Sequence, residues 1–186
     1  MILLLAAVAL AAIPTGLSGW EVLRDDDVWV GCVQRDGYPW CRSRAEVSGD
    51  LTKVERVLLD VANYPNVFHR VTQVQELAPF LLHVVLDMPF PLSDRDYVAQ
   101  YVRHQDGHDV VFSWQSVQDA AAQPTDAVRL AHSEGEWRLT PKGSRTAVTY
   151  TWNAELGGDV PEFALPRARR QWGEEVLVWL DDAVRR

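Results

Sequence analysis

The chain has 186 residues, of which 47% are hydrophobic and 8 are tryptophan, so it is long and apolar enough for one domain with a substantial core. Its formal net charge of -8 excludes nucleic-acid binding through a basic surface. No period of 20–50 residues repeats, which excludes a solenoid.

The amino-terminal end has the pattern of a secretory signal peptide. Residues 2–13, ILLLAAVALAAI, form an apolar run that is too short to span a bilayer as a helix. Pro14 and several small residues follow it, which predicts cleavage near Ser18 or Gly19. We therefore assign residues 1–19 to the signal peptide, residues 20–186 to the domain, and the protein to the periplasm or the exterior. The run carries no Lys or Arg before it, so an uncleaved anchor stays open as the alternative.

A β-hairpin is predicted over residues 28–35 and 39–47. Asp36-Gly37 stands between the two apolar runs, and this dipeptide is typical of a two-residue hairpin turn.

The register of that hairpin brings the two cysteines together. Counting outward from the turn, Cys32 lies opposite Cys41 at a site without ladder hydrogen bonds, where Cα atoms approach to about 4.5 Å. Pro39 also falls at such a site, so its missing N–H costs no ladder bond. We predict a cross-strand disulfide, which suits an exported protein. Two free core thiols are the alternative.

A helix and a series of strands follow. Asp50 can cap a helix over residues 51–61, and the stretch 63–66, NYPN, should end it. The strand-like runs are residues 70–77, 80–88, 95–104, 109–117, 127–133, 136–139 and 145–155. Several of them alternate, with one apolar face that includes Phe80, Leu82, Val84 and Leu86 in one run and Val110, Phe112 and Trp114 in another.

A long helix is predicted at the carboxyl end. Residues 159–162, DVPE, resemble a capping box, and Pro166 should kink or restart the helix. Its apolar stripe comprises Phe163, Ala168, Trp172, Val176, Trp179 and Val184. Strands in meander order with one early and one terminal helix predict an α+β fold, in which a curved antiparallel sheet wraps the long helix.

The order of these segments resembles the StAR-related lipid-transfer (START) domains, within the helix-grip superfamily that includes polyketide cyclases. The resemblance covers nearly all of residues 20–186. It rests on residues 93–97 (SDRDY), Val128-Arg129, 137–141 (WRLTP), 148–150 (VTY) and 155–161 (ELGGDVP), which leads into the terminal helix.

The resemblance implies an internal hydrophobic cavity between the sheet and the terminal helix, which holds a lipid or other hydrophobic small molecule. It implies that Arg95 faces that cavity and meets a polar group of the ligand. Alternation then puts Tyr97 on the same face and Asp96 outside. An acidic partner for Arg95 could be Glu76, Asp87 or Glu155. The alternative for Arg95 is an exposed ion pair with Asp94 or Asp96, which contributes little.

The remaining ligand-binding candidates are large apolar residues on the same strands and helix. They are Phe112, Trp114, Val128, Leu130, Trp137 and Phe163, in addition to Arg95 and Tyr97. Any single tryptophan is more often plain core, but Trp114 and Phe112 precede residues 118–125, which resemble the lid-like loop of the family. Arg129 matches a position that usually faces outward, so we interpret it as structural.

The hypothesis that the protein is an enzyme finds less support in the sequence. The five histidines are scattered, and no Ser-His-Asp order, phosphate loop or zinc spacing occurs. We expect no cofactor, no metal and no catalytic residue, a monomer, and at most a transient contact with a membrane. A cyclase, aromatase or hydrolase of the same superfamily that acts on a hydrophobic substrate is the alternative function, and a solid, ligand-free core is the third possibility.

Overall fold

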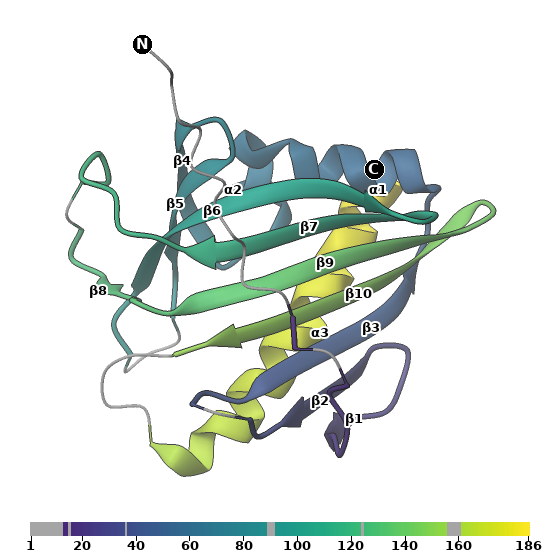
Figure 1. Cartoon of the computed structure of the whole chain (residues 1–186), viewed down its shortest axis with the longest axis horizontal. Helices are drawn as coiled ribbons and strands as arrows, with labels where there is room; N and C mark the ends of the chain where they lie inside the picture. Colours follow the sequence, from purple (N-terminus) through teal and green to yellow (C-terminus); the bar gives the residue numbers. More distant parts are fainter. Residues whose placement is uncertain (1–12, 15, 36, 89–91, 124, 156–160) are drawn as a thin grey trace.

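The chain folds around a single β-sheet with strands of different lengths. The computed structural model describes residues 13–14, 16–35, 37–88, 92–123, 125–155 and 161–186. The strands of the sheet are β1 (Glu21–Arg24), β2 (Trp29–Val33), β3 (Trp40–Val47), β4 (Val71–Ala78), β5 (Leu81–Leu86), β6 (Arg95–Asp106), β7 (Asp109–Ser116), β8 (Val128–Arg129), β9 (Ser133–Lys142) and β10 (Arg145–Ala154). They lie in the order β1-β2-β3-β10-β9-β7-β6-β5-β4, all antiparallel, while the short β8 pairs in parallel with β6. The sheet curves around α3 (Leu165–Arg185), as Figure 1 shows. The predicted α+β architecture is confirmed.

The hairpin of β2 and β3 has the predicted register. Cys32 pairs with Cys41, their Cα atoms lie 4.0 Å apart, and the two residues form a disulfide. Gly37 has a φ of +80°, which glycine adopts without steric cost, and Asp36 lies outside the described residues. The predicted cross-strand disulfide is therefore present, and both cysteines belong to the buried core.

The first helix begins as predicted. The Asp50 side chain accepts a hydrogen bond from the Lys53 amide at 2.9 Å and caps α1 (Leu51–Leu59). The chain then turns through η1 (Val61–Asn63) and α2 (Tyr64–Val67), where only an end to the helix was expected.

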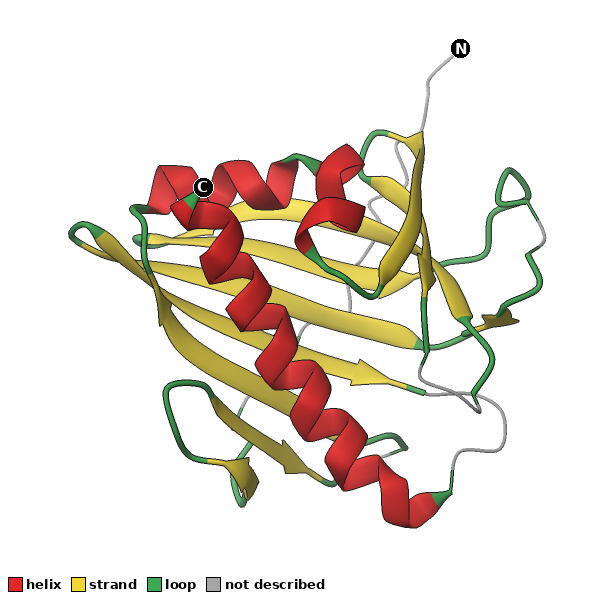
Figure 2. Ribbon diagram, turned by 180° about the vertical axis from the view of Figure 1, so that it is seen from behind, coloured by secondary structure: helices red, strands yellow, loops and turns green. Residues whose placement is uncertain are grey.

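The terminal helix restarts at Pro166, as its position predicted. Glu162–Ala164 form the 3-10 turn η2, and α3 then runs for 21 residues with Pro166 in its first turn. Its buried face consists of Gly173, Val176, Leu177, Leu180 and Val184. Figure 2 shows α3 running diagonally across one face of the sheet, which we call the concave face. Residues 156–160, which include part of the predicted capping box, lie outside the described residues.

Three differences from the predicted elements bear on the site. β1 was not predicted, and the run 127–133 contains only the short strand β8 before β9 begins at Ser133. The chain leaves the sheet after β8 because the amides of Ala131 and His132 donate to the Glu155 carboxylate rather than to a neighbouring strand. Phe80 lies in the turn between β4 and β5 and not in a strand.

Within the described residues, no helix is both long enough and apolar enough to cross a membrane.

Candidate functional site

The concave face carries a cluster of aromatic rings beneath α3. Trp114 of β7 stacks between Tyr101 of β6 and Tyr150 of β10, with ring centroids 5.8 and 5.5 Å apart. Tyr150 also contacts Trp137 of β9 at 4.3 Å and Trp152 at 4.9 Å. We call Tyr101, Trp114, Trp137, Tyr150 and Trp152 the aromatic cluster. Spacings of this kind are favourable for aromatic pairs beyond the area that they bury.

The register of β7, β9 and β10 positions the cluster, and one glycine makes room for it. Gly135 pairs with Trp114 on one side and with Trp152 on the other. A Cβ at Gly135 would lie 2.4 Å from the indole of Trp114 and 2.4 Å from the carbonyl oxygen of Thr151. The absence of a side chain there lets the indole lie flat across the strand.

The rings fill the space between sheet and helix. Among the described residues, the concave face encloses a pocket of about 20 Å³, bordered by Leu58, Val61, Tyr64, Phe80, Leu82 and Tyr101. That volume holds about one water molecule. Sites for drug-sized ligands measure roughly 300–1,000 Å³. The open, deep cavity that the resemblance implied is thus not found in this conformation.

Tyrosine hydroxyls in and beside the cluster take part in hydrogen bonds. The Tyr64 hydroxyl donates to the Leu58 carbonyl at 2.7 Å, and Trp172 Nε1 of α3 donates to the Tyr150 hydroxyl at 3.4 Å. Burial raises the pKa of Tyr64, Tyr101 and Tyr150, so all three stay neutral at physiological pH.

Five of the eight predicted ligand-binding residues face the concave side, and Arg95 among them is described below. Phe112, Trp114 and Trp137 belong to the buried core, and Tyr97 packs against it. Val128 is half-buried beside Arg95, its partner in the sheet, and Leu130 is buried outside the main core cluster. Phe163 is 87% exposed in η2, so its predicted place in the apolar stripe of the helix is wrong. It precedes α3 and cannot share the buried face of that helix.

Arg95 faces the concave side, as predicted. It pairs with Leu86 and Tyr97 pairs with Val84, and both of these partners are core residues. Arg95 is 2% exposed, and its guanidinium donates to the Ser93 carbonyl. Glu76 and Glu155, considered as acidic partners, bind the Phe80 amide and the 131–132 backbone respectively.

Asp96 lies on the other face of β6 from Arg95, as alternation predicted, but it is buried and not exposed. It points to the face opposite α3, which we call the convex face, and is fully buried. Its carboxylate accepts two hydrogen bonds from Arg129, at 2.8 and 2.7 Å, and lies 2.7 Å from Nε2 of the buried His83. Arg129 is structural, as interpreted, but its role is to neutralise Asp96.

This triad of His83, Asp96 and Arg129 sets the ionisation of its carboxylate. Burial alone would raise the pKa of Asp96, but hydrogen bonds from Arg129 and His83 outweigh burial and lower it. The triad therefore joins β5, β6 and β8 through a charge that persists at neutral pH.

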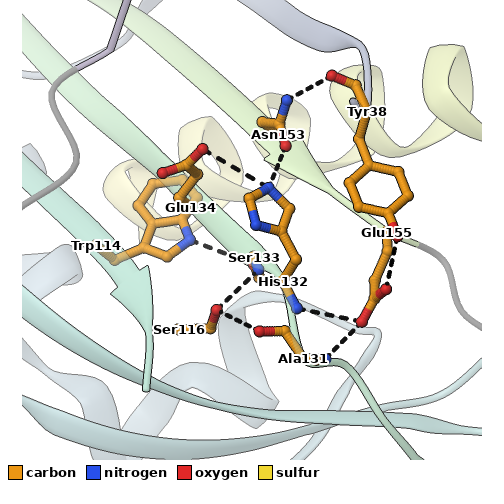
Figure 3. Close-up of polar contacts among 9 residues, drawn as sticks. All are labelled: Tyr38, Trp114, Ser116, Ala131, His132, Ser133, Glu134, Asn153 and Glu155. Atoms are coloured by element: carbon orange, nitrogen blue, oxygen red, sulfur yellow. Dashed lines mark hydrogen bonds and ion pairs between the residues drawn. The ribbon is translucent and has the colours of Figure 1, made fainter. Parts of the chain in front are cut away.

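A second polar cluster closes the sheet at the end of β10 (Figure 3). Glu155 accepts hydrogen bonds from the amides of Ala131 and His132 and from the Tyr38 hydroxyl, the last at 2.9 Å. Burial raises the pKa of Glu155, but the Tyr38 hydroxyl and the two amides more than reverse this, so the pKa is lowered. One carboxylate thus connects the β2–β3 hairpin, the segment before β9 and the end of β10.

The imidazole of His132 lies within this second cluster. It stacks on Tyr38 with ring centroids 5.3 Å apart, bonds to Asn153 Oδ1 and lies 3.6 Å from Glu134. Asn153 Nδ2 donates to the Tyr38 carbonyl at 2.6 Å, so its Oδ1 accepts and His132 Nε2 carries a proton. The polar groups of His132 and Asn153 thus have hydrogen-bond partners, and the contacts connect the β2–β3 hairpin, the segment before β9 and β10.

No group of three or more His, Cys, Asp or Glu among the described residues is placed to hold a metal ion. His104 lies in β6 and His108 in the turn that follows it, and both are exposed.

Several residues of the site were not identified from sequence, although a signal for some of them exists. Tyr101 follows Tyr97 and Ala99 at intervals of two, and Tyr150 lies between Val148 and Trp152 at the same interval, so extended alternation would place both on the concave face. The His83–Asp96 contact carries no such signal, because it depends on the pairing of two strands.

No protein-family model and no curated protein matches the sequence. Solved structures do match in fold. A STAR-related lipid transfer protein from Xanthomonas axonopodis superposes with a TM-score of 0.80 at 20% identity, over 91% of this chain and 100% of that one. Human StAR-related lipid transfer protein 5 superposes with a TM-score of 0.78 at 17% identity, over 90% and 87% of the two chains. A START superfamily protein from Mycobacterium smegmatis gives 0.63 at 13% identity, over 80% and 98%.

Proposed function

Because the chain has the START fold, with its sheet wrapped around a C-terminal helix, we propose that it binds a lipid or another hydrophobic small molecule between the sheet and α3. The observation that carries the proposal is the aromatic concave face with the buried Arg95 on the same side of the sheet. Flat rings offer apolar contact area, and a guanidinium offers donors to a polar or anionic group of the same ligand.

Binding requires the concave face to open, because the pocket is far smaller than a lipid. We take α3 to be the element that moves, because it meets the aromatic cluster through side-chain contacts such as that of Trp172 with Tyr150. Separation of α3 from β10 breaks the 3.4 Å contact between Trp172 and Tyr150 and uncovers the aromatic cluster. The ligand's apolar surface replaces that of the helix, at about 25 cal/mol per Å² before the costs of ordering.

The amino-terminal residues and the disulfide support a proposal for where the protein works. We place the mature protein, residues 20–186, outside the cytoplasm, where a disulfide such as Cys32–Cys41 persists. It works there as a monomer that touches a membrane only to load or unload its ligand. Amino-terminal sequencing of the exported protein tests the cleavage near Ser18 or Gly19.

Native mass spectrometry followed by solvent extraction tests the binding. Protein isolated from its own compartment should carry one hydrophobic molecule per chain, and a fluorescent fatty acid, cis-parinaric acid, should bind saturably at a ratio of one to one. Arg95→Gln should weaken parinarate binding by a factor of about 10 to 100, because a lost charge-assisted hydrogen bond costs about 1.5–3 kcal/mol when its partner stays buried.

The matched control is Arg103→Gln. Arg103 lies on the same strand but pairs with Glu55 at 2.6 Å, and its side chain is 37% exposed. This variant should bind parinarate like the wild type. A bare protein mass together with no saturable parinarate binding would contradict the proposed function.

A further inference from the structure

Phe80 has a backbone conformation that its side chain disfavours. Among the described residues it is the one non-glycine residue with a positive φ, +60°. A bulky residue in the left-handed region is an outlier, and the conformation costs about 1–3 kcal/mol unless the surroundings hold it in place.

The turn explains the positive φ but not the choice of phenylalanine. Ala78 pairs with Leu81, so Pro79 and Phe80 are the two turn residues between β4 and β5. Proline at the first turn position and a positive φ at the second are the features of a type II turn, which favours glycine or asparagine at the second position. A phenyl ring there offers something that glycine cannot.

Three hydrogen bonds hold Phe80 in this conformation. Its amide donates to Glu76 Oε1 at 3.1 Å. Its carbonyl accepts from the Tyr101 amide at 2.8 Å and from Gln100 Nε2 at 3.1 Å. Both backbone groups of Phe80 are therefore engaged, which fixes the backbone of this residue and leaves the ring free to rotate about its side-chain torsion.

The ring borders the 20 Å³ pocket and is its exposed side. Leu58, Val61 and Tyr64 border the pocket from α1, η1 and α2, while Leu82 and Tyr101 border it from the sheet. Each of these five residues is buried or half-buried, whereas Phe80 is 43% exposed. Movement of the Phe80 ring would join the pocket to solvent and would add the volume of the ring to it.

We propose that the pocket beneath Phe80 is a binding site for one small apolar group, an aromatic ring or the end of an alkyl chain, and that Phe80 is its movable cover. The site lies under α1 and η1 and opens without any movement of α3. It reaches the core through Phe112 and Trp137, which also border the pocket. The pocket shares Tyr101 and Trp137 with the aromatic cluster, so this inference deepens the proposed function and rests on the same concave face.

Toluene is a suitable probe, because it is one ring in size and can report on this pocket without a long alkyl chain. Its binding and exchange rate can be followed through the methyl resonances of Leu58 and Leu82 in the full chain. The wild type should show saturable shifts at both residues. Phe80→Ala removes the cover and should speed exchange about ten-fold, a factor that corresponds to about 1.4 kcal/mol. Glu76→Leu, which removes the acceptor for the Phe80 amide, should change the rate in the same direction.

Two variants serve as controls. Glu76→Gln keeps an acceptor oxygen and should exchange toluene at the wild-type rate, as should Leu59→Ala, which removes an equally exposed apolar side chain on α1. The inference is overturned if the wild type shows no shift at Leu58 and Leu82, or if Phe80→Ala and Leu59→Ala exchange at the same rate. Toluene binding without parinarate binding would support this site and contradict the proposed function, and the reverse result would do the opposite.

Discussion

The two faces of β6 differ in chemistry although their residues alternate along one strand. Arg95 and Tyr97 face α3 and the aromatic cluster, whereas Asp96, between them, faces the convex side and binds Arg129 and His83. The concave face is held by ring contacts and burial, which have no strict direction. The convex face is held by short, charge-assisted hydrogen bonds, which require a defined direction between donor and acceptor.

This difference separates the part of the sheet that can change shape from the part that cannot. Rings can slide over one another or over a ligand and still bury their surface. Removal of one member of the triad leaves a charge without its partner. We infer that the convex triad keeps β5, β6 and β8 in register while α3 and the rings adjust on the other side.

The largest expected effect is on the concave face. Trp114→Ala should lower the free energy of unfolding by about 3–5 kcal/mol, because it leaves a cavity against Tyr101 and Tyr150. Urea denaturation measures this loss. Trp20→Ala is the control, since Trp20 is half-buried and stacks on Arg42, a contact of about 0.5–1 kcal/mol. Equal losses in the two variants would show that the cluster contributes nothing special.

The next effect is on the convex face. Asp96→Ala should cost about 2–3 kcal/mol, less than a fully buried pair because the Arg129 side chain is 41% exposed. Asp94→Ala, two positions away and exposed, should cost no more than about 0.5 kcal/mol. If both variants lose a similar free energy of unfolding, Asp96 contributes no more to stability than a surface residue.

The dependence on pH sharpens the same comparison. The pKa of Asp96 is lower in the folded chain than the usual value of about 3.9, so its stabilisation is complete above about pH 4 and disappears as the pH falls through the folded pKa. The difference in unfolding free energy between wild type and Asp96→Asn should stay constant from neutral pH to about pH 5 and narrow below about pH 4. A difference that does not change with acid would contradict the lowered pKa.

The smallest effect is expected outside both faces. Phe163→Ala should change stability by less than about 0.5 kcal/mol, because the side chain is 87% exposed. Phe112→Ala, in the core, should cost about 3–5 kcal/mol in the same assay. A clear loss of unfolding free energy in Phe163→Ala would show that the Phe163 ring packs against the protein.

Residues that depend on local rules were predicted well from sequence. The Asp-Gly dipeptide predicted the register of the hairpin, and the prediction of the Cys32–Cys41 disulfide followed from counting outward from it. Asp50 began α1 and Pro166 restarted the terminal helix for the same local reasons. Alternation also placed Arg95 and Tyr97 on one face.

Residues that depend on distant partners were not. An aspartate such as Asp96 is usually found at the surface. Only the pairing of β6 with β5 and β8 brings His83 and Arg129 to it. Phe80 continued an alternating apolar run, but the two-residue turn took it out of the strand. The volume of the interior also depends on packing. The periodicity of apolar residues in the sequence shows which side chains face inward, but it does not show how much space they leave.

A photo-crosslinking fatty acid tests the central claim most directly. The probe carries a diazirine near the end of its chain, and mass spectrometry identifies the peptides that it labels after binding to the full chain. The account predicts labels on concave-face segments, in β7, β9, β10 and the buried face of α3, and competition by unlabelled fatty acid. Labels confined to convex-face positions around His83 and Arg129, or labels that excess fatty acid does not reduce, would contradict it.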